Sequence, residues 1–70
     1  MQDAAAIERI RRKYRPLRDG LDERSRRLWA ATEAVELGWG GITVLAQATG
    51  LSPTTIRSGI AEIRVQSKSP

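Results

Sequence analysis

The 70-residue chain contains no cysteine, no histidine and no phenylalanine. Without cysteine it forms no disulfide and no thiolate metal site, and without histidine it lacks the usual metal ligand and the usual general base. We therefore expect no metal, no cofactor and no self-contained catalytic site, so the chain is not expected to be an enzyme.

Long apolar runs and a secretory signal are also missing. The apolar stretches fall far short of the roughly 20 residues that a membrane-spanning helix needs. The N-terminus carries Asp3 and a run of alanines instead of a basic segment followed by an apolar core. The sequence therefore predicts a cytoplasmic protein with no membrane partner.

The charge balance is basic, with 12 lysines and arginines against 8 acidic residues and a net charge of +4. A chain of this length forms one small domain. A basic balance attracts polyanions, of which nucleic acid is the commonest. The plainer interpretation is a soluble basic protein whose charged helix faces are simply solvated.

The periodicity of apolar residues predicts an all-α fold. Four segments repeat with helical spacing, and no segment alternates as a strand would. We expect a three-helix helix-turn-helix bundle with an additional N-terminal helix. The expected organisation is an amphipathic helix and turn over residues 1–20, a DNA-binding domain over 21–65 and a frayed polar tail over 66–70.

The first helical segment runs from about Asp3 and is expected to end near Tyr14, because Pro16 disfavours helix in the residue before it. Its apolar residues share one face, which either packs on the rest of the chain or forms a homodimer interface: Ile7, Ile10, Tyr14 and Leu17. Its cations either bind phosphate or form the polar side of a packed helix: Arg9, Arg11, Arg12, Lys13 and Arg15. This apolar face is thin for an amphipathic membrane helix.

The second segment is expected from Asp22, a good N-cap, to Leu37, with Gly38 as the C-terminal cap. Its expected buried stripe consists of Leu28, Ala31, Thr32 and Val35, bordered by Trp29. The basic cluster on this segment either contacts a DNA backbone or is a solvated face: Arg24, Arg26 and Arg27. The glycines at 38, 40 and 41 predict a flexible, exposed connection. The two tryptophans could stack on bases, but the favoured interpretation is packing, with Trp29 in the core and Trp39 folded back over it.

The third and fourth segments have the anatomy of a helix-turn-helix. The third covers residues 42–49, and Gly50 follows where a tight turn favours positive φ. Leu51 is placed to fill the space under the turn. Ser52 caps the fourth helix and Pro53 occupies its first position, where the missing N–H costs nothing. The fourth helix is expected to end near Val65, with Ile56, Ile60 and Ile63 pointing inward.

This arrangement predicts a surface of short polar side chains that fits the major groove of double-stranded DNA. Arg57 is expected to bind guanine or a phosphate, while Thr54 and Ser58 would donate to base edges or phosphates. The expected DNA-binding residues are Thr43, Ser52, Pro53, Thr54, Thr55, Arg57, Ser58, Ala61 and Arg64.

Four blocks of the sequence, at residues 14–17, 21–34, 38–42 and 48–59, resemble the N-terminal region of the Rhodopirellula-type insertion-sequence transposases. The resemblance covers about Tyr14 to Ile63. It implies a helix-turn-helix that recognises transposon-end DNA during transposition, a form of DNA recombination. The family's metal-dependent catalytic domain would lie beyond Pro70. The family pattern has an arginine at the position of Ser58. Because serine is uncharged, the expected groove-facing surface of this chain has one positive charge fewer than the family pattern.

Two other functions fit the same sequence. A stand-alone helix-turn-helix transcriptional regulator would need a dimer interface, for which the N-terminal helix is the candidate. A helical protein-interaction module would never contact DNA, and the sparse charge of the last helix, Arg57 and Arg64 against Glu62, leaves this alternative open.

Overall fold

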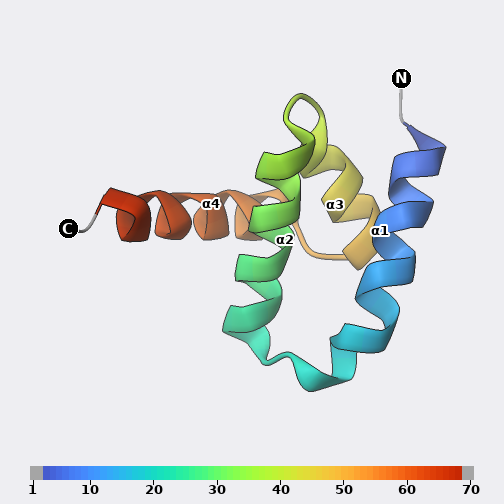
Figure 1. Ribbon diagram of the computed structural model, residues 1–70, viewed down its shortest axis with the longest axis horizontal. Coiled ribbons are helices and arrows are strands. Elements are labelled where there is room, and N and C mark those ends of the chain that lie inside the picture. Colours follow the sequence, from blue (N-terminus) through green and yellow to red (C-terminus); the bar gives the residue numbers. More distant parts are fainter. Residues whose placement is uncertain (1–2, 69–70) are drawn as a thin grey trace.

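A computed structural model describes residues 3–68, and within this range the protein is all-α, with no strand, as the sequence predicted. Figure 1 shows the helices in chain order: α1 (Ala4–Leu17), the short 3-10 helix η1 (Arg18–Gly20), α2 (Glu23–Leu37), α3 (Gly41–Thr49) and α4 (Pro53–Lys68).

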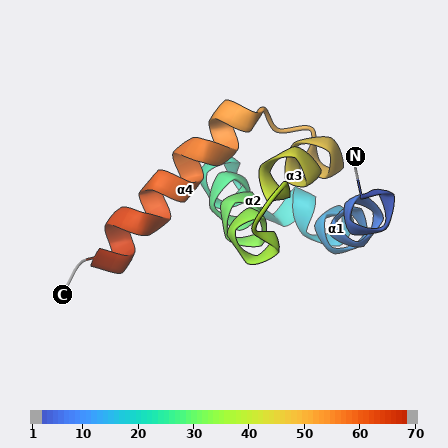
Figure 2. The ribbon, with the colours of Figure 1, turned by 90° about the horizontal axis from the view of Figure 1, so that it is seen from above.

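The helices α2 and α3 form the middle of the molecule. Helix α4 packs mainly on α2, and also on α3, while α1 packs on α3. Seen from above, α1 and α4 consequently lie on opposite sides of the α2–α3 pair (Figure 2).

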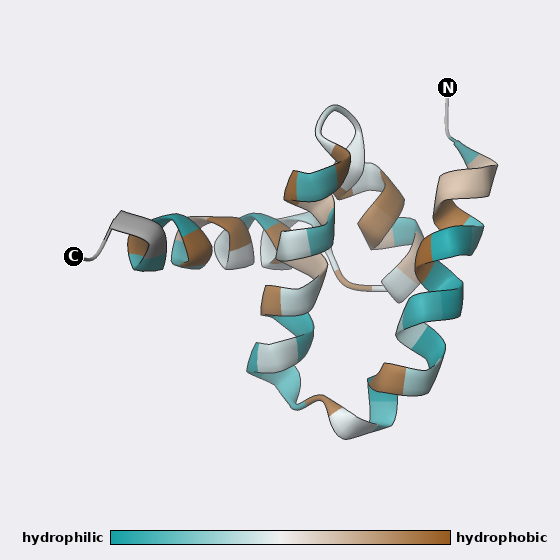
Figure 3. Ribbon diagram, in the orientation of Figure 1, coloured by the Kyte–Doolittle hydropathy of each residue, from teal (hydrophilic) through white to brown (hydrophobic). Residues whose placement is uncertain are grey.

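One core collects apolar side chains from all four helices, with Leu45 of α3 and Ile56 of α4 fully buried. Helix α1 is mostly hydrophilic in Figure 3, and it contributes Ile7 and Ile10 to this core. The face of α1 that was a candidate homodimer interface is thus buried within the chain. Leu17, expected on that face, is an exception and is exposed.

The buried side of α2 differs from the expected stripe. Its buried residues are Ala30, Ala31 and Ala34, whereas Val35 is 54% exposed and Thr32 is also exposed. Two neighbouring helices come very close to this side. A Cβ built on Gly41 of α3 would collide with the Ala34 carbonyl, and a Cβ built on Gly59 of α4 would lie 2.9 Å from the Ala31 methyl group, which leaves no room for a larger side chain at position 31.

Three polar side chains cap helices as their positions in the sequence suggest. The backbone N–H of Ala6 donates to Asp3 at 3.2 Å, that of Ser25 to Asp22 at 2.8 Å and that of Thr55 to Ser52 at 3.1 Å. Each cap satisfies a donor that has no partner inside its helix.

Two helices extend further than predicted. Helix α1 continues through Pro16 to Leu17, because a proline this close to the helix end removes only one backbone hydrogen bond, and the Arg18 N–H still donates to the Tyr14 carbonyl. Helix α4 runs to Lys68, so residues 66–68 of the expected frayed tail are helical. Residues 69–70 of that tail lie outside the described range.

Substituting Gly59 by alanine should destabilise the fold, although alanine normally favours a helix interior. The added Cβ would lie 2.7 Å from the Arg27 carbonyl oxygen and 2.9 Å from the Ala31 Cβ. Overpacking of this kind costs roughly 1–3 kcal/mol. Thermal unfolding followed by circular dichroism measures the effect. Gly20→Ala is the control, because nothing lies within 4 Å of its built Cβ; an equal or higher melting temperature for Gly59→Ala would contradict the close crossing.

Candidate nucleic-acid interface

The turn between α3 and α4 has the conformation that its sequence predicts. Gly50 adopts the left-handed region with φ of 80°, and its N–H donates to the Ala46 carbonyl at 3.0 Å. Leu51 is half-buried and packs against the core beneath the turn. The helix cap at Ser52 then starts α4 directly, so three residues connect the two helices.

Helix α4 has a buried and an exposed side, divided as predicted. Ile56 and Gly59 are buried, while Ile60 and Ile63 are half-buried. Of the positions predicted to point outward, Thr54, Arg57, Ser58 and Ala61 are exposed, as is Arg64, whereas Thr55 is half-buried. With about 100° between successive residues, Thr54 and Ala61 lie at the centre of this exposed side. Arg57 and Arg64 follow one of its edges, next to Ile60.

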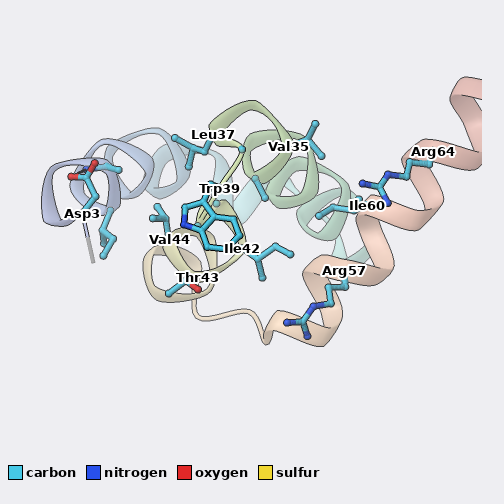
Figure 4. A pocket seen from close by; sticks show the side chains of 16 residues that line it. Asp3, Val35, Leu37, Trp39, Ile42, Thr43, Val44, Arg57, Ile60 and Arg64 are labelled. Atoms are coloured by element: carbon cyan, nitrogen blue, oxygen red, sulfur yellow. Dashed lines mark hydrogen bonds between the residues drawn. The ribbon is translucent and has the colours of Figure 1, made fainter. Parts of the chain in front are cut away.

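The remaining predicted DNA-binding residues surround this surface. Ser52 and Pro53 are exposed at the start of α4. Thr55 is half-buried, and its hydroxyl accepts a hydrogen bond from the Ser52 hydroxyl at 2.9 Å, which reduces its availability to a ligand. Thr43 is exposed on α3. It borders an open hollow between α3 and α4 that Arg57 also lines (Figure 4).

Glu62, the acidic residue of α4, faces α2 and is paired there. Its carboxylate accepts from Arg24 at 2.9 Å and from Arg27 at 3.1 Å. The hydrogen bond from Arg27, helped by Arg24, lowers the pKa of Glu62 below its ordinary value. The negative charge of Glu62 is therefore neutralised at the α2 contact, and over residues 53–66 the charges on the exposed side of α4 are positive.

The basic cluster of α2 is used within the chain. Arg24 and Arg27 pair with Glu62, and Arg26 donates to the Arg18 carbonyl at 2.9 Å, which ties α2 to η1. By contrast, no hydrogen bond or ion pair engages the side chains of Arg57 and Arg64 within residues 3–68. Among the side chains of α4 that the structure describes, residues 53–66, these two guanidinium groups are the cations that face solvent.

The cations of α1 lie on another side of the molecule. Arg11 pairs with Glu8 at 3.2 Å, and Lys13 pairs with Glu33 of α2 at 3.0 Å. Because α1 and α4 lie on opposite sides of α2 and α3 (Figure 2), these cations do not extend the exposed side of α4 into one continuous basic surface.

The two tryptophans have different environments. Trp29 is half-buried and lies beside Tyr14, with ring centroids 5.4 Å apart. Trp39 is 103% exposed, so the expectation that it folds back over Trp29 is wrong. The connection between α2 and α3 is a hydrogen-bonded turn with Gly41 buried at the start of α3, which keeps the indole in solvent. The glycines on both sides of Trp39 were the feature of the sequence that indicated an exposed turn.

The described residues show no other obvious site. Within residues 3–68 no group of three or more acidic side chains is arranged to hold a metal ion, and no helix in that range has the length and apolar character required to cross a membrane. Comparison of the chain with models of protein families, with curated proteins and with solved structures finds no match.

Acidification should weaken the fold partly through Glu62. Because its pKa is lowered in the folded state, its stabilising effect is complete above the pKa of a free glutamate, ~4.3, and is lost as the pH falls through the lower folded value. Urea unfolding between pH 7 and pH 2.5 should therefore show a smaller loss of stability for Glu62→Gln than for the unmodified chain. Part of the pH dependence of stability should remain in Glu62→Gln, because the pKa of Asp22 is also lowered in the folded state, by the hydrogen bond from the Ser25 N–H. Identical pH profiles would contradict the pairing.

Proposed function

We propose that this chain is a DNA-binding module in which α3, the Gly50 turn and α4 act as a helix-turn-helix, with α4 entering the major groove of double-stranded DNA. The observation that carries the proposal is the exposed side of α4. It combines the hydroxyl groups of Thr54 and Ser58, the small Ala61 and the exposed Val65 with two arginines that have no partner among residues 3–68. A groove-entering helix needs short side chains for close approach and cations for the phosphates.

The kind of DNA follows from the resemblance of the sequence to the N-terminal region of insertion-sequence transposases. On that basis we propose that the module recognises transposon-end DNA and does not itself catalyse strand cleavage. The alternative of a dimeric transcriptional regulator receives less support, because the apolar face of α1 that would form its dimer interface is buried in the core through Ile7 and Ile10.

Binding by such a small surface should be modest and sensitive to salt. Each phosphate neutralised by a cation lowers the logarithm of the affinity by about 0.9 per tenfold increase in salt concentration. The assay is fluorescence anisotropy with a labelled duplex of random sequence, about 30 base pairs long so that it can hold a few protein molecules. We expect binding at low salt that weakens steeply as salt is added.

Ala61→Glu and Leu17→Glu form a matched pair that tests where the duplex binds. Both positions are exposed and both substitutions remove one unit of net charge. Ala61 lies on α4, whereas Leu17 is the last residue of α1, which packs on the other side of the α2–α3 pair. Ala61→Glu should weaken duplex binding about tenfold or more, an effect of the ~1–3 kcal/mol expected at a groove contact, and Leu17→Glu should change it about twofold at most.

Melting temperatures of both variants should equal that of the unmodified chain, since neither side chain is buried. Equal weakening by the two substitutions would indicate attraction by net charge alone and would contradict a binding surface on α4. No binding of the unmodified chain at low salt would reject the proposal altogether.

A further inference from the structure

Trp39 is the most exposed of the large apolar side chains in the described part of the protein, and its backbone holds it there. Gly38 and Gly40, on either side, have φ of 73° and 79°, a region that other residues rarely adopt. The Gly38 N–H donates to the carbonyls of Ala34 and Val35, and the Gly41 N–H donates to the Gly38 carbonyl at 2.9 Å. We call residues 38–41 the Trp39 turn.

The Trp39 turn and α4 border one open hollow of about 950 Å³. Its apolar lining includes Val35, Ile42 and Ile60, and on the α4 side it is edged by Arg57 and Arg64. Figure 4 shows both arginines extending from α4 toward this hollow, with Trp39 on its other side. The start of α1 also lines the hollow, through Asp3, Ala6 and Ile7, and the Asp3 carboxylate accepts from the Ala6 N–H. The hollow therefore combines an apolar lining and an exposed aromatic ring with two cations on the α4 side, which have no partner among residues 3–68, and one carboxylate on the α1 side.

The position of the two arginines on α4 is informative. They are seven residues apart, which is two helical turns and about 10 Å along the helix axis. They follow the edge of the exposed side that adjoins the hollow, whereas Thr54 and Ala61 lie at its centre. A duplex seated on the centre of that side would bring one of its strands over this edge.

We propose that the hollow receives the sugar-phosphate backbone of the DNA strand that flanks α4. Arg57 and Arg64 contact its phosphates, and the indole of Trp39 packs against a deoxyribose or a terminal base edge. This inference rests on the proposed function and changes the role of Arg57, from a residue that can read a base to one that positions the backbone. A backbone offers the matching chemistry, since its phosphates are anionic and its sugars are largely apolar.

An acidic protein segment would also complement two arginines and an apolar lining. The observations favour DNA because the arginine edge is continuous with the hydroxyl-bearing exposed side of α4, which has Thr54 and Ser58 within one turn of Arg57. A segment confined to the hollow would leave that side uncovered. A second copy of the chain would have to bring acidic groups to the same edge.

The test uses the random duplex and compares Trp39→Ala with Leu17→Ala. Both remove an exposed apolar side chain, but Leu17 lies on α1, away from the hollow. Trp39→Ala should weaken binding about fivefold or more, the lower end of what loss of an aromatic contact to nucleic acid produces. Leu17→Ala should leave the affinity unchanged, and both variants should keep the native melting temperature.

Salt dependence separates the aromatic contact from the ionic ones. Arg57→Ala and Arg64→Ala should each reduce the salt slope by about 1 and weaken binding equally on different sequences, as expected for phosphate contacts. Trp39→Ala should leave the slope unchanged, because no charge is lost. In a Trp29→Phe background the emission of Trp39 alone should shift to shorter wavelength when duplex is added.

The outcomes distinguish the two proposals. If the unmodified chain does not bind duplex, both fail. If it binds and Trp39→Ala has no effect, or if Arg57→Ala changes sequence preference, the hollow is not the backbone site while DNA binding stands. If Trp39→Ala lowers the mass of the DNA-free chain in sedimentation equilibrium, the hollow belongs to a second copy and the inference is wrong.

Discussion

The exposed side of α4 depends on the contact that α4 makes with α2 at Gly59. Because Gly59 has no side chain, the backbone of α4 approaches the Arg27 carbonyl and the Ala31 methyl group more closely than any other residue would permit. This contact fixes the rotation of α4 about its own axis, and Ile56 enters the core as a result. Since successive residues are 100° apart, the same rotation directs Thr54, Ser58 and Ala61 outward. A surface of short polar residues is therefore set by small residues on the opposite side of the helix.

Charge reinforces the same orientation. Glu62 lies between the contact side and the exposed side of α4, and it is bound by both Arg24 and Arg27. Exposed ion pairs contribute little to stability individually, but here one carboxylate joins two guanidinium groups of α2, so its position relative to α2 is defined. The pairing also removes the negative charge of α4 from the surface on which Arg57 and Arg64 remain free of described partners. The net charge of the chain is thus less important than its distribution over the helices.

Local features of the sequence predicted most of the α3–α4 region. The cap at Ser52 and the positive φ of Gly50 follow from steric rules that involve only neighbouring residues, and the isoleucines of α4 define its inward side by spacing. The buried side of α2 was not predictable in this way, because alanine gives a weak apolar signal and the close contact at Ala31 comes from Gly59, which is distant in the sequence. The environment of Trp39 was missed for a related reason. A large aromatic residue suggests burial, whereas the hydrogen bonds of its turn determine that it is exposed.

The arrangement of cations bears on how much DNA affinity this surface can provide. If only Arg57 and Arg64 neutralise phosphates, the logarithm of the affinity should fall by about two for each tenfold increase in salt concentration. This is a small electrostatic contribution for a DNA-binding module. The cations of α1 cannot add to it on the same duplex segment, because they lie on the other side of α2 and α3. Non-ionic contacts are then required. The hydroxyl groups of Thr54 and Ser58 can supply some of them, and the indole of Trp39, which shares the hollow with both arginines, can supply another. The weak charge of α4 and the exposure of Trp39 are thus explained together if both contact one strand of a duplex.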